Sequence, residues 1–276
     1  MELEILKAIQ SIANPFFDWL FEMITILGEQ TTIIIAIAII YWAFNKRFAL
    51  FIVYSTLTNT LVNGVIKGIF NRKRPIGEPG IRSLRTETAT GHSFPSGHTQ
   101  QATGFYGSMA QYINKKGVYI FVGLLILLIG FSRLYLGVHW PTDVLCGAIF
   151  GIITLLITNY LFNKVEDKAL LFIGTFIVFL PTVFFVPSAD LIKALGAFGG
   201  VALGTFIETR FVNFSEEGTT FKKIIRVILG IVFVLAVKVL TKKLFPDTLT
   251  FDFVRYMILT LALIGIYPAI FKKLNL

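Results

Sequence analysis

The sequence VYIFVGLLILLIGFSRLYLGVHWPTD, residues 118–143, joins an apolar run to a short polar group. Residues 118–131 carry no charge, and Ser132-Arg133 and then His139 follow them. Asp143 closes the stretch and opens the next apolar run. Since about 20 apolar residues cross the roughly 30 Å core of a bilayer, the stretch predicts the end of one membrane helix and the start of another.

The whole chain shares this apolar character. Hydrophobic residues make up 55% of its 276 residues and charged residues 15%, and the mean hydropathy is +0.76. Ordinary soluble domains are about a quarter charged. The composition therefore predicts an all-α, polytopic integral membrane helix bundle. About nine spans are expected, near residues 29–45, 48–70, 97–114, 117–137, 141–162, 169–187, 189–209, 223–243 and 253–271.

The first 27 residues differ from these spans because charges interrupt them, at Glu2, Glu4, Lys7, Asp18 and Glu22. Asn14-Pro15 also breaks the segment, since proline lacks the helical N–H donor. Residues 1–27 are therefore expected to form interfacial helices, and neither a span nor a cleavable signal peptide.

Basic residues predict the orientation in the membrane. They stand in pairs between spans, at Lys46-Arg47, Lys115-Lys116, Lys222-Lys223 and Lys272-Lys273. Alternating the nine spans puts all four pairs on one side, which the positive-inside rule makes cytoplasmic. The net charge of +9 therefore lies in membrane anchors, and no nucleic-acid partner is expected. The expected location is the cell (inner or plasma) membrane.

The loop at residues 71–96 is an exception to that rule. It falls on the extracytoplasmic side, yet it carries Arg72, Lys73, Arg74, Arg82 and Arg85. A functional demand for cations at an outward-facing active site explains this, and an inverted topology is the alternative. The first reading is favoured, because inversion would move four basic pairs to the wrong side to correct one loop.

Two cations stand where this loop begins, Lys67 and Arg74, seven residues apart. Seven residues make about two helical turns, so both side chains share one face, and Pro75 favours a helix end at Arg74. Snorkelling of both cations to the membrane edge is the plain alternative. It explains Lys67 poorly, since an ionisable group within an apolar segment is costly without a partner or a site.

A second motif, Pro95-Ser96-Gly97-His98, stands where the next helix is expected to begin. Backbone N–H groups at a helix N-terminus bind oxyanions, and Gly97 permits their close approach. A serine N-cap without any ligand is an equally ordinary reading.

The third motif pairs His139 with Asp143, four residues later, so that the carboxylate can bond one ring nitrogen and orient the other. Alone, this pair would indicate a helix cap beside a surface histidine. Phosphoryl transfer needs cations near the phosphoryl oxygens and groups that attack phosphorus and protonate the leaving oxygen. The three motifs together supply Lys67, Arg74 and Arg133 as cations and His98 and His139 for the proton and nucleophile chemistry.

The motifs resemble the signature K-x6-R-P, P-S-G-H and S-R-x5-H-x3-D of the type 2 phosphatidic acid phosphatase superfamily of lipid phosphate phosphatases, in its bacterial membrane branch. The resemblance covers about residues 1–165. It implies hydrolysis of lipid phosphates through a phosphohistidine, without a metal or other cofactor. It also implies that His139 is the nucleophile, that Asp143 orients it and that His98 is the general acid. The implied phosphate-binding residues are Lys67, Arg74, Ser96, Gly97 and Arg133.

The chain is expected to divide into this core, residues 1–165, and an additional four-helix transmembrane unit of unknown role, residues 166–276. Gly196, Gly200 and Gly204 give that unit a small-residue helix face. Such a face suits packing within the chain, which is favoured, or a homodimer.

The expected substrate is a lipid monophosphate or diphosphate. Undecaprenyl diphosphate is the first candidate, because an outward-facing site suits recycling of a polyprenyl carrier, and phosphatidate and phosphatidylglycerol phosphate are alternatives. A binder or transporter of phosphorylated lipids is the alternative from another class. Contacts of His92, Arg82 or Arg85 with substrate are left open.

Overall fold

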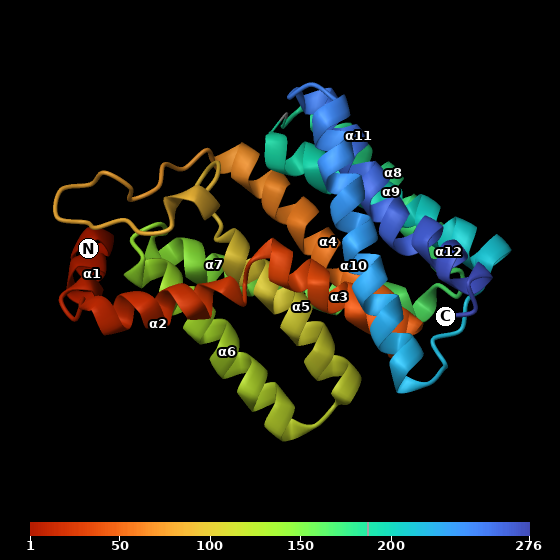
Figure 1. The fold of residues 1–276 in the computed structure, drawn as a ribbon. Helices are drawn as coiled ribbons and strands as arrows, with labels where there is room; N and C mark the ends of the chain where they lie inside the picture. The colour runs from red at the N-terminus through yellow and green to blue at the C-terminus, as the bar shows by residue number, and fades with distance from the viewer. Residues whose placement is uncertain (187) are drawn as a thin grey trace. The chain divides into compact units, whose positions relative to one another are not determined.

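The computed structural model describes residues 1–186 and 188–276. Over these residues the chain is helical and forms no strand, which confirms the predicted all-α fold (Figure 1). The helices are α1 (Glu2–Gln10), α2 (Pro15–Ile26), α3 (Gln30–Ala43), α4 (Lys46–Phe70), α5 (Gly97–Ile113), α6 (Lys116–Tyr135), α7 (Pro141–Lys164), α8 (Lys168–Phe179), α9 (Ala189–Ile207), α10 (Thr220–Leu244), α11 (Leu249–Leu261) and α12 (Tyr267–Lys273). Short 3₁₀ or π segments are η1 (Thr86–Thr88), η2 (Leu180–Phe184), η3 (Glu208–Val212) and η4 (Ala262–Ile266).

The chain is a multi-pass membrane protein. Within the described residues, six helical segments are long and apolar enough to cross a bilayer: Lys46–Phe70, Lys116–Tyr135, Pro141–Lys164, Ala189–Val212, Thr220–Leu244 and Leu249–Lys273. Helices α2 and α3 pass the same test as a pair bent by 45°, which raises the count to seven.

The predicted count of about nine spans is not confirmed, because three of the expected spans are short. Helices α3, α5 and α8 have 14, 17 and 12 residues, whereas about 20 are needed to cross a bilayer. Polar residues explain the difference at α5, where Thr99, Gln100, Thr103 and Ser108 are buried. The expected span at 169–187 ends at a residue outside the described part of the chain.

Contacts between Cα atoms divide the chain into two compact units. The first, called the site unit below, contains Met1–Ile33 and Thr58–Thr158. The second, called the extension unit, contains Ile34–Leu57 and Asn159–Leu276. The division into functional parts at residue 165 remains a prediction.

In the site unit, the two N-terminal helices pack on α6. Asn14 caps α2 by accepting hydrogen bonds from the N–H groups of Phe16 and Phe17, both at 3.0 Å, and Pro15 occupies the first helical turn. This cap accounts for the break predicted at Asn14-Pro15. Phe21 of α2 then packs against Tyr135 at the end of α6, with ring centroids 4.5 Å apart.

In the extension unit, α9 packs closely on α11. A Cβ atom at Gly196 or Gly200 would collide with the carbonyl oxygens of Phe253 and Met257, respectively. The predicted small-residue face is therefore covered by a helix of the same chain, which was the favoured reading. A homodimer remains untested.

Candidate active site

Helix α4 ends at Phe70, because Asn71 takes a left-handed conformation with φ 49°. The predicted helix end at Arg74 and the predicted shared helical face of Lys67 and Arg74 are therefore wrong, and Arg74 lies in the 71–96 segment that joins α4 to α5.

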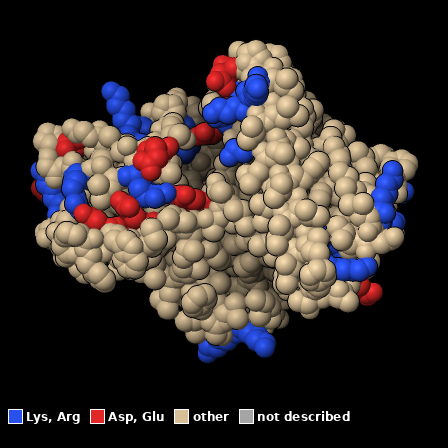
Figure 2. All heavy atoms as spheres, viewed as in Figure 1, with Lys and Arg blue, Asp and Glu red and all other residues tan. Residues whose placement is uncertain are grey.

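Polar contacts fix the 71–96 segment in place. Gln10 Nε2 of α1 donates to the carbonyl oxygens of Arg82 and Tyr135, at 2.7 and 2.8 Å. Near the end of the segment, Ser93 N donates to Arg72 O at 2.8 Å. Figure 2 shows acidic and basic side chains intermixed over the end of this unit that carries α1. The N-terminal helices thus hold a loop that has little helical structure of its own.

His139 lies in the turn between α6 and α7, and its side chain is buried. Its Nδ1 atom is 3.4 Å from Asp143 Oδ2 and 3.5 Å from Ser93 Oγ. Its Nε2 atom is 2.9 Å from Nη1 of Arg74. Because a guanidinium can only donate, Nε2 carries the lone pair and Nδ1 carries the proton. This is the tautomer that a nucleophilic Nε2 requires.

The pKa of His139 lies well below the ordinary value of 6.5. Burial is the main cause, because it disfavours the charged imidazolium. The positive charges of Arg74, Arg133 and Lys67 lower the pKa further. The ring is therefore neutral at pH 7, as a nucleophile must be.

Protein donors surround both oxygens of the Asp143 carboxylate. Ser93 Oγ and Trp140 N donate to Oδ2, the second at 2.8 Å. Arg72 Nη1 donates to Oδ1 at 3.0 Å. A carboxylate bonded in this way has a fixed position, so it can hold the ring of His139 in one orientation.

Arg72 is held in turn by Glu2, the first residue of α1, through an ion pair at Nη2. Glu2 also accepts hydrogen bonds from N and Oγ1 of Thr142, at 3.1 and 2.7 Å. Neither Arg72 nor Glu2 is one of the motif residues that mark the site in the sequence. No short-range signal could have found Glu2, because it lies 140 residues from Thr142 along the chain.

The motif Pro95-Ser96-Gly97-His98 starts α5, as predicted. Ser96 is the N-cap, and its Oγ accepts from Oγ1 of Thr99 at 3.0 Å. A Cβ atom at Gly97 would lie 3.8 Å from Nζ of Lys67, so the lysine of α4 faces this helix start. Ser96 N donates to the main-chain oxygen of Asp143 at 2.9 Å, which joins the start of α5 to the start of α7.

Arg133 and His98 carry buried atoms that are not hydrogen-bonded within the protein. Arg133 Nη1 donates to Thr25 Oγ1 at 2.8 Å. Arg133 Nε and Nη2 and His98 Nε2 find no partner among residues 1–186 and 188–276. Buried donors without partners are costly, so these atoms fit an anion with several oxygens.

The amide side chains of Asn63 and Gln100 connect the motif Pro95-Ser96-Gly97-His98 to α4. Asn63 Nδ2 of α4 donates to Pro95 O at 3.2 Å and to Gln100 Oε1 at 2.9 Å. Gln100 Nε2 donates to Asn59 O at 3.3 Å. Asn63 and Gln100 lie outside the three motifs, and the only sign of them in the sequence is an amide side chain within an apolar helix.

The three residues left open by the sequence have plain structural surroundings. Arg82 pairs with Asp18, with Nη1 2.8 Å from Oδ2, and Arg85 pairs with Glu29. His92 is exposed, and its main-chain oxygen accepts from Arg74 Nη2 at 3.3 Å. Both arginines thus fasten the loop to the N-terminal segment.

The geometry as a whole defines a class of protein. Lys67, Arg74 and Arg133 are cations of one buried polar region that also contains the His139–Asp143 pair and the capped start of α5. Over the described chain, no group of three or more His, Cys, Asp or Glu side chains could hold a metal ion. Such a site in a multi-pass helix bundle is that of a membrane phosphatase acting on phosphorylated lipids.

Comparison with known proteins gives the same class. Residues 48–167 match the PAP2 superfamily, and residues 192–276 match the transmembrane extension of PAP2 superfamily phosphatases. Phosphatidylglycerophosphatase B of Bacillus subtilis is 31% identical over 173 residues, which cover 58% of this chain and 82% of that protein. Undecaprenyl-diphosphatase BcrC of Bacillus subtilis is 28% identical, covering 60% of this chain and 85% of its own.

A solved structure agrees with these matches. The crystal structure of Aquifex aeolicus LpxE shares 27% identity with this chain, with a TM-score of 0.52, and covers 58% of this chain and 94% of its own. The chain belongs to the PAP2 superfamily, and it is a phosphatase of the lipid phosphate class.

Proposed function

We propose that this protein hydrolyses a lipid phosphate through a phosphohistidine formed on His139. The observation that carries the proposal is the geometry of that ring: its Nδ1 faces Asp143 and Arg74 covers its Nε2 lone pair. Burial and the neighbouring cations also lower the pKa of the ring, which favours its neutral form. The same guanidinium that marks the lone pair is placed to bind a phosphoryl oxygen beside it.

The first step joins Nε2 of His139 to phosphorus and breaks the bond between phosphorus and the leaving oxygen. His98, protonated on both ring nitrogens, gives its Nε2 proton to that oxygen and becomes neutral. In the second step, water attacks phosphorus, its proton passes to His98, and the P–N bond breaks to release phosphate. Lys67, Arg74 and Arg133, with the hydroxyl of Ser96 and the backbone N–H of Gly97, stabilise the phosphoryl oxygens in both steps.

The mechanism requires no metal ion, because three side-chain cations already surround the phosphoryl position. The oxygens of Asp143 are bonded to Ser93, Trp140 and Arg72, so the carboxylate serves the histidine rather than an ion. The lipid is the partner, and the membrane brings it to the site.

We propose undecaprenyl diphosphate as the substrate, with phosphatidate and phosphatidylglycerol phosphate as the alternatives to test. Similarity to BcrC supports the first, and similarity to phosphatidylglycerophosphatase B supports the last. Phosphate release from each pure lipid in mixed micelles decides among them. A preference of at least about tenfold in kcat/KM for one lipid identifies the substrate class.

The central experiment replaces the nucleophile. Purified His139→Ala protein should release phosphate at least about 1,000-fold more slowly than the natural protein, with binding of the lipid retained. His92→Ala is the matched control, because this exposed histidine lies in the neighbouring loop, and it should stay within about twofold. Phosphate release at the natural rate by His139→Ala would refute the nucleophile and leave a binder or transporter as the better reading.

We further propose that the site opens near the extracytoplasmic face. The basic pairs at 46–47 and 115–116 support this orientation. In a Cys146→Ala background, an impermeant thiol reagent should label a cysteine placed at Glu78 in intact cells and leave one placed at Lys116 unlabelled. The reverse pattern would invert the topology.

A further inference from the structure

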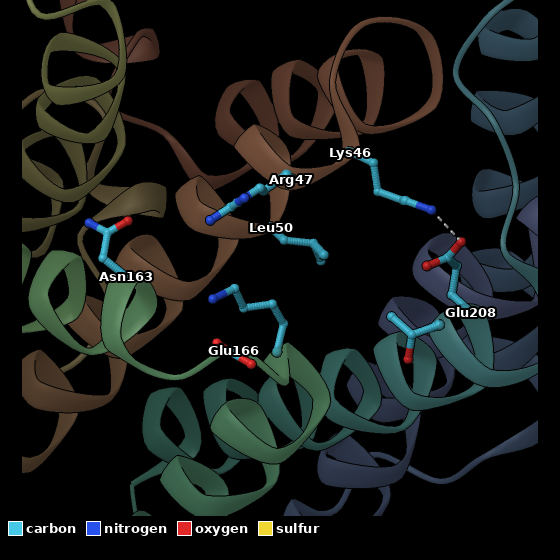
Figure 3. A pocket seen from close by; sticks show the side chains of 8 residues that line it. Lys46, Arg47, Leu50, Asn163, Glu166 and Glu208 are labelled. Carbon is cyan, nitrogen blue, oxygen red and sulfur yellow. Dashed lines mark hydrogen bonds and ion pairs between the residues drawn. The ribbon is translucent and has the colours of Figure 1, made fainter.

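The extension unit contains a cavity that is lined mainly by charged and polar residue types and that the proposed phosphatase chemistry does not use. It has a volume of about 500 Å³ and is lined by residues from three parts of this unit (Figure 3). Lys46, Arg47 and Leu50 come from the start of α4, Asn163 from the end of α7, Glu166 and Lys168 from the segment that leads into α8, and Glu208 and Thr209 from η3, directly after α9.

Glu208 is the most informative residue in this cavity, because its side chain is fully buried. Its Oε1 atom accepts hydrogen bonds from Lys46 Nζ at 2.9 Å and from Phe214 N at 3.1 Å. Its Oε2 atom has no hydrogen-bond partner in the described part of the chain. In Figure 3 this second oxygen turns away from Lys46 and toward the cavity. A buried carboxylate oxygen in this position calls for a donor from a ligand.

The other side of the cavity is positively charged and would bind an anionic group. Arg47 is exposed, and its guanidinium makes no ion pair with any residue that the structure describes. Lys168 adds a second positive charge, and its ammonium is fixed by the carbonyl oxygens of Phe162 and Val165. Figure 3 shows Arg47 and Asn163 on one side of the cavity and Glu208 on the other. Asn163 donates from Nδ2 to O and Oδ1 of Asn159, both at 3.0 Å, so the phosphate donors here are the two cations. Two cations form an ordinary site for a phosphate group.

The position of the cavity along the helices indicates where its ligand comes from. Lys46 begins α4, Asn163 and Lys168 flank the end of α7 and the start of α8, and Glu208 directly follows α9. All lie at ends of apolar helices, and the ends of membrane helices lie at the level of the lipid headgroups. The lining carries both signs (Lys46, Arg47 and Lys168 against Glu166 and Glu208), so each charge of a zwitterionic headgroup has groups of the opposite sign there.

We propose that this cavity binds a phosphoethanolamine group, with the phosphate at Arg47 and Lys168 and the ammonium at Glu208. The group is the headgroup of phosphatidylethanolamine and also exists as a soluble phosphate ester. This site shares no residue with the proposed catalytic site, so the proposal does not depend on the phosphohistidine mechanism.

The test is native mass spectrometry of the full-length, delipidated protein with phosphatidylethanolamine or phosphatidylcholine of identical acyl chains. Choline has no N–H donor for Glu208, whereas both lipids carry the same phosphate. The natural protein should retain phosphatidylethanolamine at least about fivefold better than phosphatidylcholine. Equal retention of the two lipids would overturn the proposal.

Variants localise that preference to the cavity. Glu208→Gln should bring the two lipids within about twofold, because the amide offers a donor in place of an acceptor. Arg47→Gln changes an exposed residue, so it keeps the test decisive if Glu208→Gln fails to fold, and it should lower retention by about fivefold. Lys115→Gln removes the same charge from an exposed connection in the site unit and should change nothing. Unchanged retention by Arg47→Gln would place the lipid elsewhere and refute this site.

Soluble phosphoethanolamine distinguishes the two sources of the group. If millimolar phosphoethanolamine displaces the bound lipid while phosphocholine does not, the headgroup alone is recognised. If neither displaces a lipid whose retention still depends on Arg47 and Glu208, the membrane lipid is the ligand. Displacement by both esters to the same extent would show no selection for the amine and would overturn the proposal.

Discussion

Two buried arginines, one in each unit, differ in how their donors are used. Arg133 of the site unit is 0% exposed and Arg226 of the extension unit is 2% exposed. Arg226 donates from Nη1 to Trp42 O at 2.7 Å and Ser215 O at 3.2 Å, and from Nη2 to Leu276 O at 2.6 Å. Arg133 donates once, to Thr25 Oγ1, and keeps both Nε and Nη2 unpaired within the described residues, whereas Arg226 keeps only Nε unpaired there.

This difference indicates whether a buried cation in a membrane protein has a structural or a ligand-binding role. An arginine whose donors end on main-chain oxygens stabilises the fold, since it satisfies carbonyl groups that the chain leaves unpaired. An arginine that keeps donors unpaired carries their cost in the folded state, and a ligand with several oxygens removes that cost. On this reading, Arg133 binds substrate and Arg226 fastens segments of its own unit.

Replacement of each arginine by methionine is the strongest test of whether unpaired donors distinguish a substrate-binding arginine from a structural one. Arg133→Met should slow phosphate release by about 100- to 1,000-fold, because one donor to the transition state is lost, while thermal unfolding in detergent changes little. Arg226→Met should keep activity per folded molecule within about twofold and lose about 3 kcal/mol of stability, because several buried carbonyls lose their partner. The reverse assignment of the two effects would show that unpaired donors do not mark the site.

Arg72 is an intermediate case, because it lies at the site and its guanidinium donates to Asp143 and Glu2 of the protein. Arg72→Gln should lower kcat by about 10- to 100-fold, since it removes a charge-assisted bond to Asp143, and should leave KM nearly unchanged. Arg72→Lys should recover part of the rate. The matched control is Arg210→Gln, which breaks the Arg210–Asp167 ion pair in the extension unit. A large rise in KM for Arg72→Gln would instead make Arg72 a substrate-binding residue.

The charge of the site predicts a smaller effect of pH. Burial and the neighbouring cations lower the pKa of His139, so its ring takes up a proton only well below pH 6.5. The activity of a neutral nucleophile is therefore retained as the pH falls through 6.5, and kcat/KM should fall by less than about twofold between pH 7.5 and 6.5. Two substrates whose phosphates differ in pKa separate the titration of the enzyme from that of the substrate. A tenfold fall over this range with both substrates would contradict the neutral ring.

Removal of metal ions is expected to have the smallest effect. Because Lys67, Arg74 and Arg133 supply the positive charge, phosphate release should stay within experimental error after treatment with EDTA. Activity that disappears with EDTA and returns with added Mg²⁺ would contradict the proposed mechanism.

Much of the fold and of the site could be predicted from local patterns. Apolar runs gave most of the long helices, and the Ser96 cap marked the start of α5. The spacing of His139 and Asp143 within one turn suggested a contact that the structure places at 3.4 Å. These features depend on residues that are close in sequence.

The remaining features depend on residues that are far apart in sequence. The burial of the polar residues on α5 could not be predicted from the sequence. An amide such as Gln100 suggests a position at the membrane interface, and only the fold shows that it is hydrogen-bonded to Asn63. Arg82 and Arg85 resembled free cations because their partners Asp18 and Glu29 lie on another part of the chain. Pairing of this kind follows from tertiary packing and not from sequence spacing.

The main-chain bond from Ser96 N to Asp143 O has a mechanical consequence. A Cβ atom at Gly147, one turn further along α7, would lie only 2.8 Å from Ser96 O, so the two backbones also touch there. The start of the helix that carries His98 is thus held by peptide groups against the start of the helix that follows His139. In the proposed mechanism, backbone contacts therefore set the spacing of the two histidines, and a lipid phosphate would have to fit that spacing.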